Sequence, residues 1–553
     1  MHLENVLVNQ RRNALSLVCS SPPEILQYIF RLFADEESDR QTHYRPRKGR
    51  TLPTVVPSYV CTRWRRICLN DGYLWATLSL DWSGRWPFEF VARSGNWPLQ
   101  VSLSLSETSI SEKEHTVTRH INRIRALHVD FARGRMGVPR AFCDSILNQP
   151  APLLESLSLS HAPQPSSGII TLSSTIFSSI APRLRSLSLT LVRLPDSMIP
   201  AFSHLKTVET RGSLTTEAAV CLLRTTPSLK VLICNPLIYQ FGVELDPSSS
   251  GSERINAPQL TTLVMKNVKS AELIQVLEAL EAPSLSQIVV SDIIDSSLIQ
   301  SNHDHLDDIA TSLPMALSSH IKVLRRLHGP IQELIVNVSS VTCWPSRSAL
   351  HLYGDTDDID DTYAFYINYW MVNFNSFDDA QPLFDGLLRV LPVDEVHTLS
   401  LHDIVWPYPS LYRIANTTEL RYTSIKSLSD TPYLLQAMIP LEQRIGVGER
   451  ILPQSQILFP RLAKIVFKDA KVPADGEKLV CVLQCLAQAR RRDGITLEVA
   501  FEGCNYRAGV MAGLKDVNVT WNGTWCPPFS FGGLGEDPQL ENWEMWGSLF
   551  DQP

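Results

Sequence analysis

An internal repeat constrains the fold of this 553-residue chain more than any other feature of its sequence. The unit is Pro-x-Leu-x-x-Leu-x-Leu, in which other aliphatic residues can replace the leucines. Clear copies are PLLESLSL (152–159), PRLRSLSL (182–189), PSLKVLIC (227–234), PQLTTLVM (258–265), PSLSQIVV (283–290) and PRLAKIVF (460–467). Weaker copies are NRIRALHV (122–129) and SHLKTVET (203–210). Such self-similarity predicts one supersecondary unit that recurs along the chain.

The spacing inside the unit predicts a short strand. Leu-x-Leu places two apolar side chains on one face, because successive residues of a strand point to opposite faces. From Ile124 to Leu285 the lead aliphatic residues of successive copies stand between 21 residues (Leu184 to Leu205) and 31 residues (Leu229 to Leu260) apart, and the next clear copy follows only at Leu462. One unit cannot bury its apolar face alone, so neighbouring units are expected to stack on each other.

Stretches with helical patterns lie between the predicted strands, for example LTTEAAVCLLRTT (214–226) and SAELIQVLEALEA (270–282). A strand and a helix in each unit predict an α/β fold, with an irregular solenoid and a parallel sheet. Residues 303–329 are predicted to form a further helix, interrupted at Pro314 because proline lacks the backbone N–H. Residues 477–494 are also predicted to be a helix, with Arg490-Arg491-Arg492 as its polar end and Gly494 as its stop.

Residues 18–82 have helical rather than strand periodicity and are predicted to form a separate domain. Ser20 or Ser21 can cap a helix, and Pro22-Pro23 suits its first positions. Apolar residues then recur on one helical face at Ile25, Leu26, Ile29, Phe30 and Phe33.

The rest of this domain is predicted as a loop and a second helix. Residues 34–57 are charged, contain proline and lack periodicity, which indicates an inserted loop. Beyond it, one helical stripe contains Val60, Trp64, Ile67 and Cys68, and Asn70-Asp71-Gly72 is predicted to end that helix.

These two segments resemble the F-box of the large fungal F-box protein families. PPEILQYIF is similar to the opening helix, and VCTRWRRICLNDGYLWATLSL is similar to the closing half, with its Val-Cys-x-x-Trp-Arg core and later Leu-Trp. Residues 83–522 resemble the leucine-rich-repeat region that usually follows, and residues 523–553 are expected to be an irregular tail. Two features depart from the family: Ser21 replaces the usual Leu before Pro-x-Glu, and the segment 34–57 is unusually long.

The resemblance implies a substrate-recognition adaptor of an SCF-type cullin–RING E3 ubiquitin ligase, with no catalytic, cofactor or metal site of its own. The F-box would dock on a Skp-type adaptor, which attaches to the cullin scaffold, and the repeats would bind an unknown substrate protein. The implied docking residues are Pro23, Ile25, Leu26, Ile29, Phe30, Val60, Trp64 and Ile67. Of these, Val60, Trp64 and Ile67 would be shared with the domain's own core, and Trp75 would pack the F-box onto the first repeat.

Two other classes of function remain open. The first is a non-ligase repeat-protein scaffold with a degenerate F-box, which Ser21 and the long segment 34–57 favour. The second is an enzyme with a dispersed active site. The sequence contains no Gly-x-Ser-x-Gly, phosphate-binding loop or His-Glu-x-x-His motif, which lowers the weight of the enzyme hypothesis.

The composition and charge indicate which kinds of partner and which cellular compartment to expect. A net charge of −7 and a pI near 6.1 are not typical of a nucleic-acid-binding protein. No apolar run approaches the roughly 20 residues of a membrane-spanning helix, and the apolar stretch 14–18 is shorter than the roughly 7–15 residues of a signal-peptide core. The 11 cysteines are scattered and form no Cys-x-x-Cys, which favours a reducing compartment, cytoplasmic or nuclear.

Overall fold

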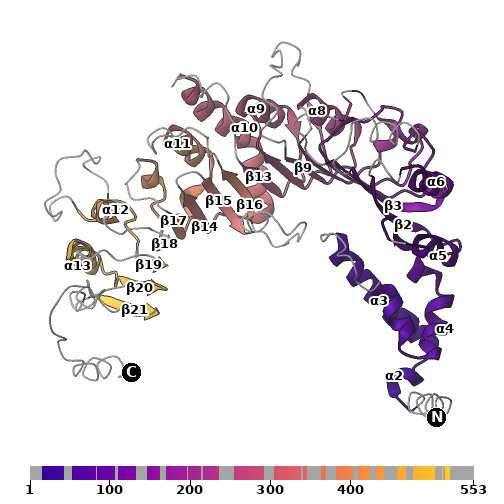
Figure 1. The fold of residues 1–553 in the computed structure, drawn as a ribbon. Coiled ribbons are helices and arrows are strands. Elements are labelled where there is room, and N and C mark those ends of the chain that lie inside the picture. Colours follow the sequence, from indigo (N-terminus) through magenta and orange to yellow (C-terminus); the bar gives the residue numbers. More distant parts are fainter. Residues whose placement is uncertain are drawn as a thin grey trace, which may run out of the picture. The chain divides into compact units, whose positions relative to one another are not determined.

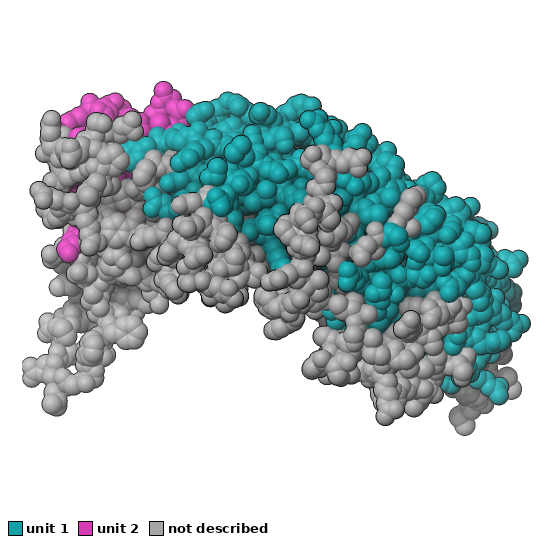
Figure 2. All heavy atoms as spheres, turned by 90° about the horizontal axis from the view of Figure 1, so that it is seen from above, with its two compact units in different colours: residues 1–397, 408–414 teal, residues 398–407, 415–553 magenta. Residues whose placement is uncertain are grey.

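The structure is a computed structural model, and the chain divides into two compact units (Figure 2). Unit 1 comprises residues 1–397 and 408–414, and unit 2 comprises residues 398–407 and 415–553. The residues that the structure describes are 15–42, 53–82, 84–105, 110–131, 146–161, 170–195, 197, 199–212, 216–235, 254–291, 304–337, 340–345, 363–368, 381–402, 409–423, 431–440, 457–468, 477–504, 514 and 517–522. The predicted tail 523–553 lies outside them.

The N-terminal part of unit 1 is helical. Its elements are α2 (Leu17–Ser20), α3 (Pro23–Thr42), the 3₁₀ helix η1 (Pro53–Tyr59), α4 (Thr62–Asn70) and the 3₁₀ helix η2 (Gly72–Trp75). Helix α3 begins at Pro23, and the carbonyl of Pro22 accepts hydrogen bonds from the N–H groups of Ile25 and Leu26. Helix α4 ends at Asn70, as predicted. Helix α3 lies beside α4 (Figure 1) and also contacts η1.

Helix α3 is longer than its apolar pattern predicted. A loop was expected from residue 34, but residues 34–42 continue the helix and residues 53–59 form η1. The segment from Glu24 to Arg45 contains no glycine or proline, and its Glu, Arg and Gln residues are good helix formers. The loss of apolar periodicity at residue 34 therefore does not mark the end of the helix.

A large, mostly parallel sheet forms the body of unit 1 (Figure 1). In spatial order its strands are β1 (Thr77–Ser79), β2 (Leu99–Leu105), β3 (Ile124–Phe131), β4 (Ser156–His161), β6 (Ser186–Thr190), β8 (Thr207–Arg211), β9 (Val231–Asn235), β11 (Thr262–Lys266), β13 (Gln287–Ser291), β16 (Tyr363–Asn368), β15 (Ser340–Pro345) and β14 (Glu333–Asn337). Neighbouring strands from β1 to β16 are parallel. Strand β15 pairs antiparallel with both β16 and β14.

The repeated leucines build one interior layer of this sheet. Leu157, Leu187 and Val208 are register partners across β4, β6 and β8, and all three are buried. The lead residues Leu154 and Leu184 are also completely buried. Every copy of the repeat contains a strand, so the strand predictions made from it are confirmed. The parallel sheet follows because each copy presents the same side chains at the same register.

Helices connect and cover these strands. The longer ones in unit 1 are α5 (Trp86–Arg93), α6 (Ile110–His120), α8 (Thr216–Thr225), α9 (Ser270–Ala279), α10 (Asp304–His328) and α11 (Gln381–Val390). The predicted helices at 214–226 and 270–282 are confirmed as α8 and α9, which lie on the same side of the sheet (Figure 1). Successive helices from α8 to α11 contact each other.

Short elements complete the connections of unit 1. They are the 3₁₀ helices η3 (Ile121–Arg123), η4 (Ile176–Ser179), η5 (Pro200–Phe202), η8 (Val393–Glu395) and η9 (Pro409–Arg413) and two small parallel pairs, β5 (Ile170–Thr171) with β7 (Val192–Arg193) and β10 (Ile255–Asn256) with β12 (Leu280–Glu281).

Helix α10 continues through Pro314, so the interruption predicted there is wrong. Proline cannot donate a hydrogen bond to the carbonyl four residues earlier, which here belongs to Ala310. Helix α11 packs closely at this point: a Cβ atom at Gly386 would overlap the Ala310 oxygen and lie 2.9 Å from Pro314 Cγ. Close packing of α11 thus covers the site of the missing hydrogen bond.

Unit 2 is also an α/β structure. Its parallel strands, in order, are β17 (Thr398–His402), β18 (Glu419–Thr423), β19 (Lys464–Lys468), β20 (Glu498–Glu502) and β21 (Asn518–Asn522), and its helices are α12 (Thr431–Ala437) and α13 (Glu477–Arg492). The rings of Tyr422, Phe467 and Phe501 stack across neighbouring strands, with successive centroids 5.3 and 5.1 Å apart. This aromatic row is buried and belongs to the core of the unit.

Arg490 differs from its predicted place at the polar end of α13. Its side chain is completely buried, and Nη2 donates hydrogen bonds to the carbonyls of Met438 (3.2 Å), Leu458 (3.4 Å) and Phe459 (2.8 Å). Burial lowers the pKa of this guanidinium. Arg490 therefore ties two connecting segments to the helix, whereas Gly494, at φ +78°, ends the helical region as predicted.

Candidate protein-docking surface

One face of α3 presents apolar side chains to solvent. Ile25, Ile29 and Leu32 recur at i, i+4 and i+7, which places them on a single helical face. They are 51%, 47% and 51% exposed, respectively. An apolar helical stripe normally packs against the protein core, so this outward-facing stripe requires an explanation.

The opposite face of α3 packs inside the protein. Leu26 and Phe30 are 0% and 3% exposed, and Ala34 is also buried. The ring of Phe30 lies against that of Trp64 on α4, with centroids 4.8 Å apart. Helix α3 is therefore apolar on two faces, and α4 and η1 cover only one of them.

Further exposed apolar residues lie on α3 and on the segment from η1 to α4. We call seven of these residues the outer apolar surface: Ile25, Tyr28, Ile29, Leu32, Phe33, Val56 and Val60. The exposed Tyr59 at the end of η1 lines a cavity and is not counted among them. Helix α3 and η1 are in contact, so the set spans neighbouring elements. Large contiguous exposed apolar patches are uncommon on monomeric soluble proteins and commonly mark interaction sites.

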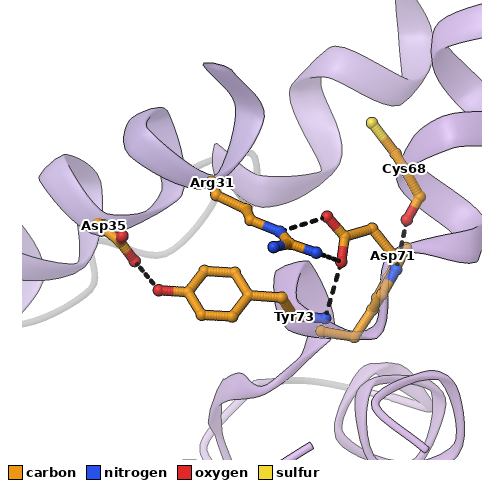
Figure 3. Close-up of polar contacts among 6 residues, drawn as sticks. Arg31, Asp35, Cys68, Asp71 and Tyr73 are labelled. Carbon is orange, nitrogen blue, oxygen red and sulfur yellow. Dashed lines mark hydrogen bonds and ion pairs between the residues drawn. The ribbon is translucent and has the colours of Figure 1, made fainter. Parts of the chain in front are cut away.

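An ion pair between the partly exposed Arg31 and the buried Asp71 holds α3 against the segment that follows α4 (Figure 3). Arg31 Nε and Nη2 donate to the two carboxylate oxygens of Asp71 at 2.8 and 2.9 Å. Asp71 Oδ1 also accepts the N–H of Tyr73 at 3.2 Å, and the Tyr73 hydroxyl donates to Asp35 at 2.7 Å. The hydrogen bond to Asp71 raises the pKa of Arg31, and burial raises the pKa of Tyr73 to about 12. This network orients the outer apolar surface.

Arg63 attaches the start of the helical region to α4. Its Nη1 donates to the carbonyl of Cys19 at 2.6 Å, and its Nη2 donates to that of Ser21 at 2.7 Å. The Ser21 hydroxyl donates to the Leu17 carbonyl at 3.1 Å, so it closes α2 instead of capping α3. The polar residue at this position therefore serves the turn between two helices.

Trp75 joins the helical region to the first elements of the sheet. It is 2% exposed, and its Nε1 donates to the carbonyl of Cys68 at 2.8 Å. Its ring lies 4.8 Å from that of Phe90 on α5, and the Arg93 guanidinium lies 4.6 Å from its centroid. Trp75 thus links α4 to α5, beside the start of β1.

The eight predicted docking residues separate into two groups. Four are exposed: Pro23, Ile25, Ile29 and Val60. Four are buried or half-buried: Leu26, Phe30, Trp64 and Ile67. The second group builds the interior that supports the first, so only the exposed group is accessible to another molecule.

Several residues of this region were not identified from the sequence. Leu32 follows Ile25 and Ile29 at helical spacing, so periodicity was a sufficient signal for it. Arg31 and Asp71 stand 40 residues apart, and no local pattern connects them. Only folding of α3 onto α4 brings this pair together.

The described ranges show little that indicates other chemistry. They contain no group of three or more His, Cys, Asp or Glu residues that could hold a metal ion. Each cysteine among them is a free thiol. No helix in this part of the chain has the length and apolar character needed to cross a membrane.

The fold and this surface define a mixed α/β protein with a large, mostly parallel sheet and an exposed apolar helical face. No protein-family model matches the chain, and no curated protein matches it.

Proposed function

We propose that this chain is a substrate-recognition adaptor of an SCF-type cullin–RING E3 ubiquitin ligase. In this proposal, residues 18–82 form an F-box that docks on a Skp-type adaptor through the outer apolar surface. Residues 83–522 form a leucine-rich-repeat-like solenoid that holds a substrate protein. The observation that carries the proposal is the exposure of Ile25 and Ile29 on a helix whose other face is already packed.

The energetics favour a protein partner for this face. Fully burying a Leu or Ile side chain contributes about 1.5–3 kcal/mol. Ile25, Ile29 and Leu32 are each about half exposed, so covering their exposed halves contributes roughly 1 kcal/mol apiece by the same scale. The Arg31–Asp71 pair holds α3 in place before docking, which reduces the ordering cost of association.

The repeat region offers a polar face for the substrate. Ser102, His128, Ser158 and Ser188 are register partners on the side of the sheet opposite the repeated leucines. A solenoid presents such residues as a continuous surface. The adaptor itself makes no covalent bond: it raises the local concentration of the substrate near the ubiquitin-conjugating enzyme.

The proposal assigns a reducing compartment, the cytoplasm or the nucleus. Free thiols persist there, and each cysteine that the structure describes is free. Neither a nucleic acid nor a membrane is a partner in this proposal.

The first prediction concerns capture of a purified Skp-type adaptor by the full chain. Ile25→Asp combined with Ile29→Asp is expected to reduce capture at least tenfold, because each carboxylate would be desolvated in an apolar interface. Both native side chains are exposed, so the variant should fold. Capture is measured by pull-down, and folding by circular dichroism and thermal unfolding.

The matched control is Met315→Asp combined with Leu327→Asp on α10. These side chains are 68% and 48% exposed and lie outside the outer apolar surface. Capture by this control should equal that of the wild-type chain. Equal capture by both double variants would refute the docking assignment.

The alternative function is a repeat-protein scaffold with a degenerate F-box. It is favoured by Ser21, which stands where the F-box families usually have Leu. The Ser21 hydroxyl donates a hydrogen bond to the carbonyl of Leu17. If the folded wild-type chain captures no Skp-type adaptor, the scaffold is the better explanation.

A further inference from the structure

A cavity of about 320 Å³ lies in unit 1 among η1, α4, η2 and α5. Its volume is at the lower end of the range for small-ligand sites, roughly 300–1,000 Å³. None of the residues of the outer apolar surface lines it. The cavity therefore adjoins the outer apolar surface along η1, where Val55 and Tyr59 line it, but it shares none of the seven residues of that surface.

The lining of this cavity is basic. It includes Arg65 of α4, Arg85 just before α5 and Arg93 at the end of α5, whereas Glu89 is its one acidic residue. Three arginines and one glutamate give a formal charge of 3 − 1 = +2. Arginine retains its charge at any relevant pH, so the cavity attracts an anion throughout the physiological range.

One of the three guanidinium groups is held in place. Arg93 Nη2 lies 2.9 Å from Glu89 Oε2, and its guanidinium carbon lies 4.6 Å from the ring centroid of Trp75. The side chains of Arg65 and Arg85 are exposed and have no hydrogen bond or ion pair with the part of the chain that the structure describes. The Glu89 carboxylate thus compensates Arg93, and the charges of Arg65 and Arg85 remain available to a ligand.

Aromatic rings line the same cavity as these arginine side chains. Tyr59 and Trp86 line the cavity and are exposed, and the buried Trp75 also contributes to the wall. Each guanidinium group can donate two parallel hydrogen bonds to two oxygens of a phosphate. The exposed aromatic rings can stack on a flat ring of a ligand.

We propose that this cavity binds a phosphate monoester dianion carried by an aromatic or similarly flat group. A phosphate monoester carries about −1.5 to −2 charges at pH 7, which matches the formal +2 of the lining better than a single carboxylate does. The ester can belong to a phosphorylated side chain of a protein or to a small free molecule. Both sources present the same group to Arg65 and Arg85.

The test is isothermal titration calorimetry of the full chain with phenyl phosphate and with a phosphotyrosine peptide. Arg65→Ala is expected to weaken binding of both probes at least tenfold. Arg66→Ala is the matched control: it removes the same charge from the next position of α4, is exposed and does not line the cavity. It should change the affinity less than twofold.

The two sources of the ester are distinguished by comparing the probes. A phosphotyrosine peptide that binds at least tenfold more tightly than phenyl phosphate supports a protein ligand. Equal affinity supports a small free ester.

The pH dependence of phosphate binding is a second measurement that tests the proposal. Affinity for phenyl phosphate should rise from pH 5 to pH 7 as the ester loses its second proton, with a pKa of about 6. Benzoate should bind at least tenfold more weakly than phenyl phosphate at pH 7.

Three results would overturn the proposal: neither phosphate probe binds at millimolar concentration, Arg65→Ala and Arg66→Ala weaken binding equally, or benzoate binds as tightly as phenyl phosphate. Ile25→Asp with Ile29→Asp should leave phosphate binding unchanged, so failure of the docking proposal and failure of this one give different results.

Discussion

Asp71 is the residue on which the geometry of the helical region depends most. Its carboxylate is buried, pairs with both the Nε and Nη2 of Arg31, and accepts the N–H of Tyr73 at the start of η2. A buried carboxylate is stable as an anion only when its oxygens have donors. Here three donors from two elements satisfy it, and they also determine where α3 lies.

The second prediction concerns Asp71→Ala. Loss of the carboxylate leaves a partly buried guanidinium without its partner and removes the cap of η2, so unfolding should be easier by about 1–3 kcal/mol. Asp71→Asn keeps an acceptor for Tyr73 but loses the charge, and it should cost less. The free energy of unfolding is measured by urea denaturation.

The matched control for this pair is Arg254→Ala. It removes the exposed ion pair of Arg254 with Glu281, whose atoms lie 2.7 Å apart. Exposed ion pairs contribute about 0–1 kcal/mol, so the control should be nearly neutral. Equal effects of Asp71→Ala and Arg254→Ala on the free energy of unfolding would show that the buried Asp71 pair is no more stabilising than an exposed one.

At the scale of elements, the contact between α10 and α11 combines two residues that usually weaken helices. Pro314 removes one hydrogen bond inside α10, and Gly386 is conformationally costly inside α11. Their positions are complementary, because the absence of a side chain at Gly386 lets α11 approach the Ala310 carbonyl. Each residue alone would disfavour its helix, and the close approach of the two helices compensates.

The third prediction follows from this contact. In an ordinary helix, Gly→Ala stabilises by about 0.5–1 kcal/mol. Gly386→Ala should instead destabilise by about 1–3 kcal/mol, because the new methyl group would overlap the Ala310 oxygen and force the helices apart. The denaturation midpoint in urea decides the sign.

Arg389→Ala serves as the control on the same helix. Its side chain is exposed, and surface substitutions usually change stability by less than about 0.5 kcal/mol. A stabilising Gly386→Ala would mean that α11 does not approach α10 as closely as the structure indicates.

At the scale of the whole molecule, several histidines of unit 1 make stability depend on pH. Burial lowers the pKa of His120, His161 and His320 below the usual value for histidine. His320 is the clearest case, since it is 2% exposed and its Nε2 lies 2.9 Å from the carbonyl oxygen of Leu277. The neutral imidazole is therefore favoured at this buried position, because the charged imidazolium would lose its hydration there.

The sign of the resulting pH dependence follows from linkage. Above about pH 6.5 these histidines are neutral in both the folded and the unfolded state. As the pH falls below that value the unfolded chain binds protons first, so the free energy of unfolding decreases. The loss continues until the pH reaches the lowered pKa values of the folded state.

The fourth prediction is therefore a fall in the melting temperature between pH 7 and pH 5.5, measured by calorimetry. His320→Gln retains a side-chain N–H donor for Leu277 but cannot titrate, so its melting temperature should fall less over this range. His115→Gln, a change of an exposed histidine on α6, is the matched control. An identical pH dependence for wild type and His320→Gln would exclude His320 as a cause.

Local sequence patterns account for some strands of the sheet and not for others. The repeat leucines predict strands, and the alternation of LQVSLSL, which lies outside the repeat, is also typical of a strand and forms β2. Strand β21 lies outside the repeat as well. Strand β15 runs antiparallel between β14 and β16, and its direction depends on which strands it pairs with, a choice that no local pattern identifies.

In the candidate docking surface, too, local pattern and tertiary packing decide different features. Periodicity placed Ile25, Leu26, Ile29 and Phe30 on α3, but it did not show which of them would be covered. Packing of Phe30 against Trp64 turned Leu26 and Phe30 inward and left Ile25 and Ile29 outside. That choice depends on α4, which is distant in sequence.

The sequence by itself determined the strands of the repeat, the helices α8 and α9 and the helix limits at Pro23 and Gly494, because backbone geometry and apolar spacing act over a few residues. Only the tertiary structure decided that α10 continues through Pro314, that Arg490 is buried and that Arg31 meets Asp71. Each of these outcomes depends on desolvation and packing by segments far along the chain. Such partners contribute energy only after the chain has folded.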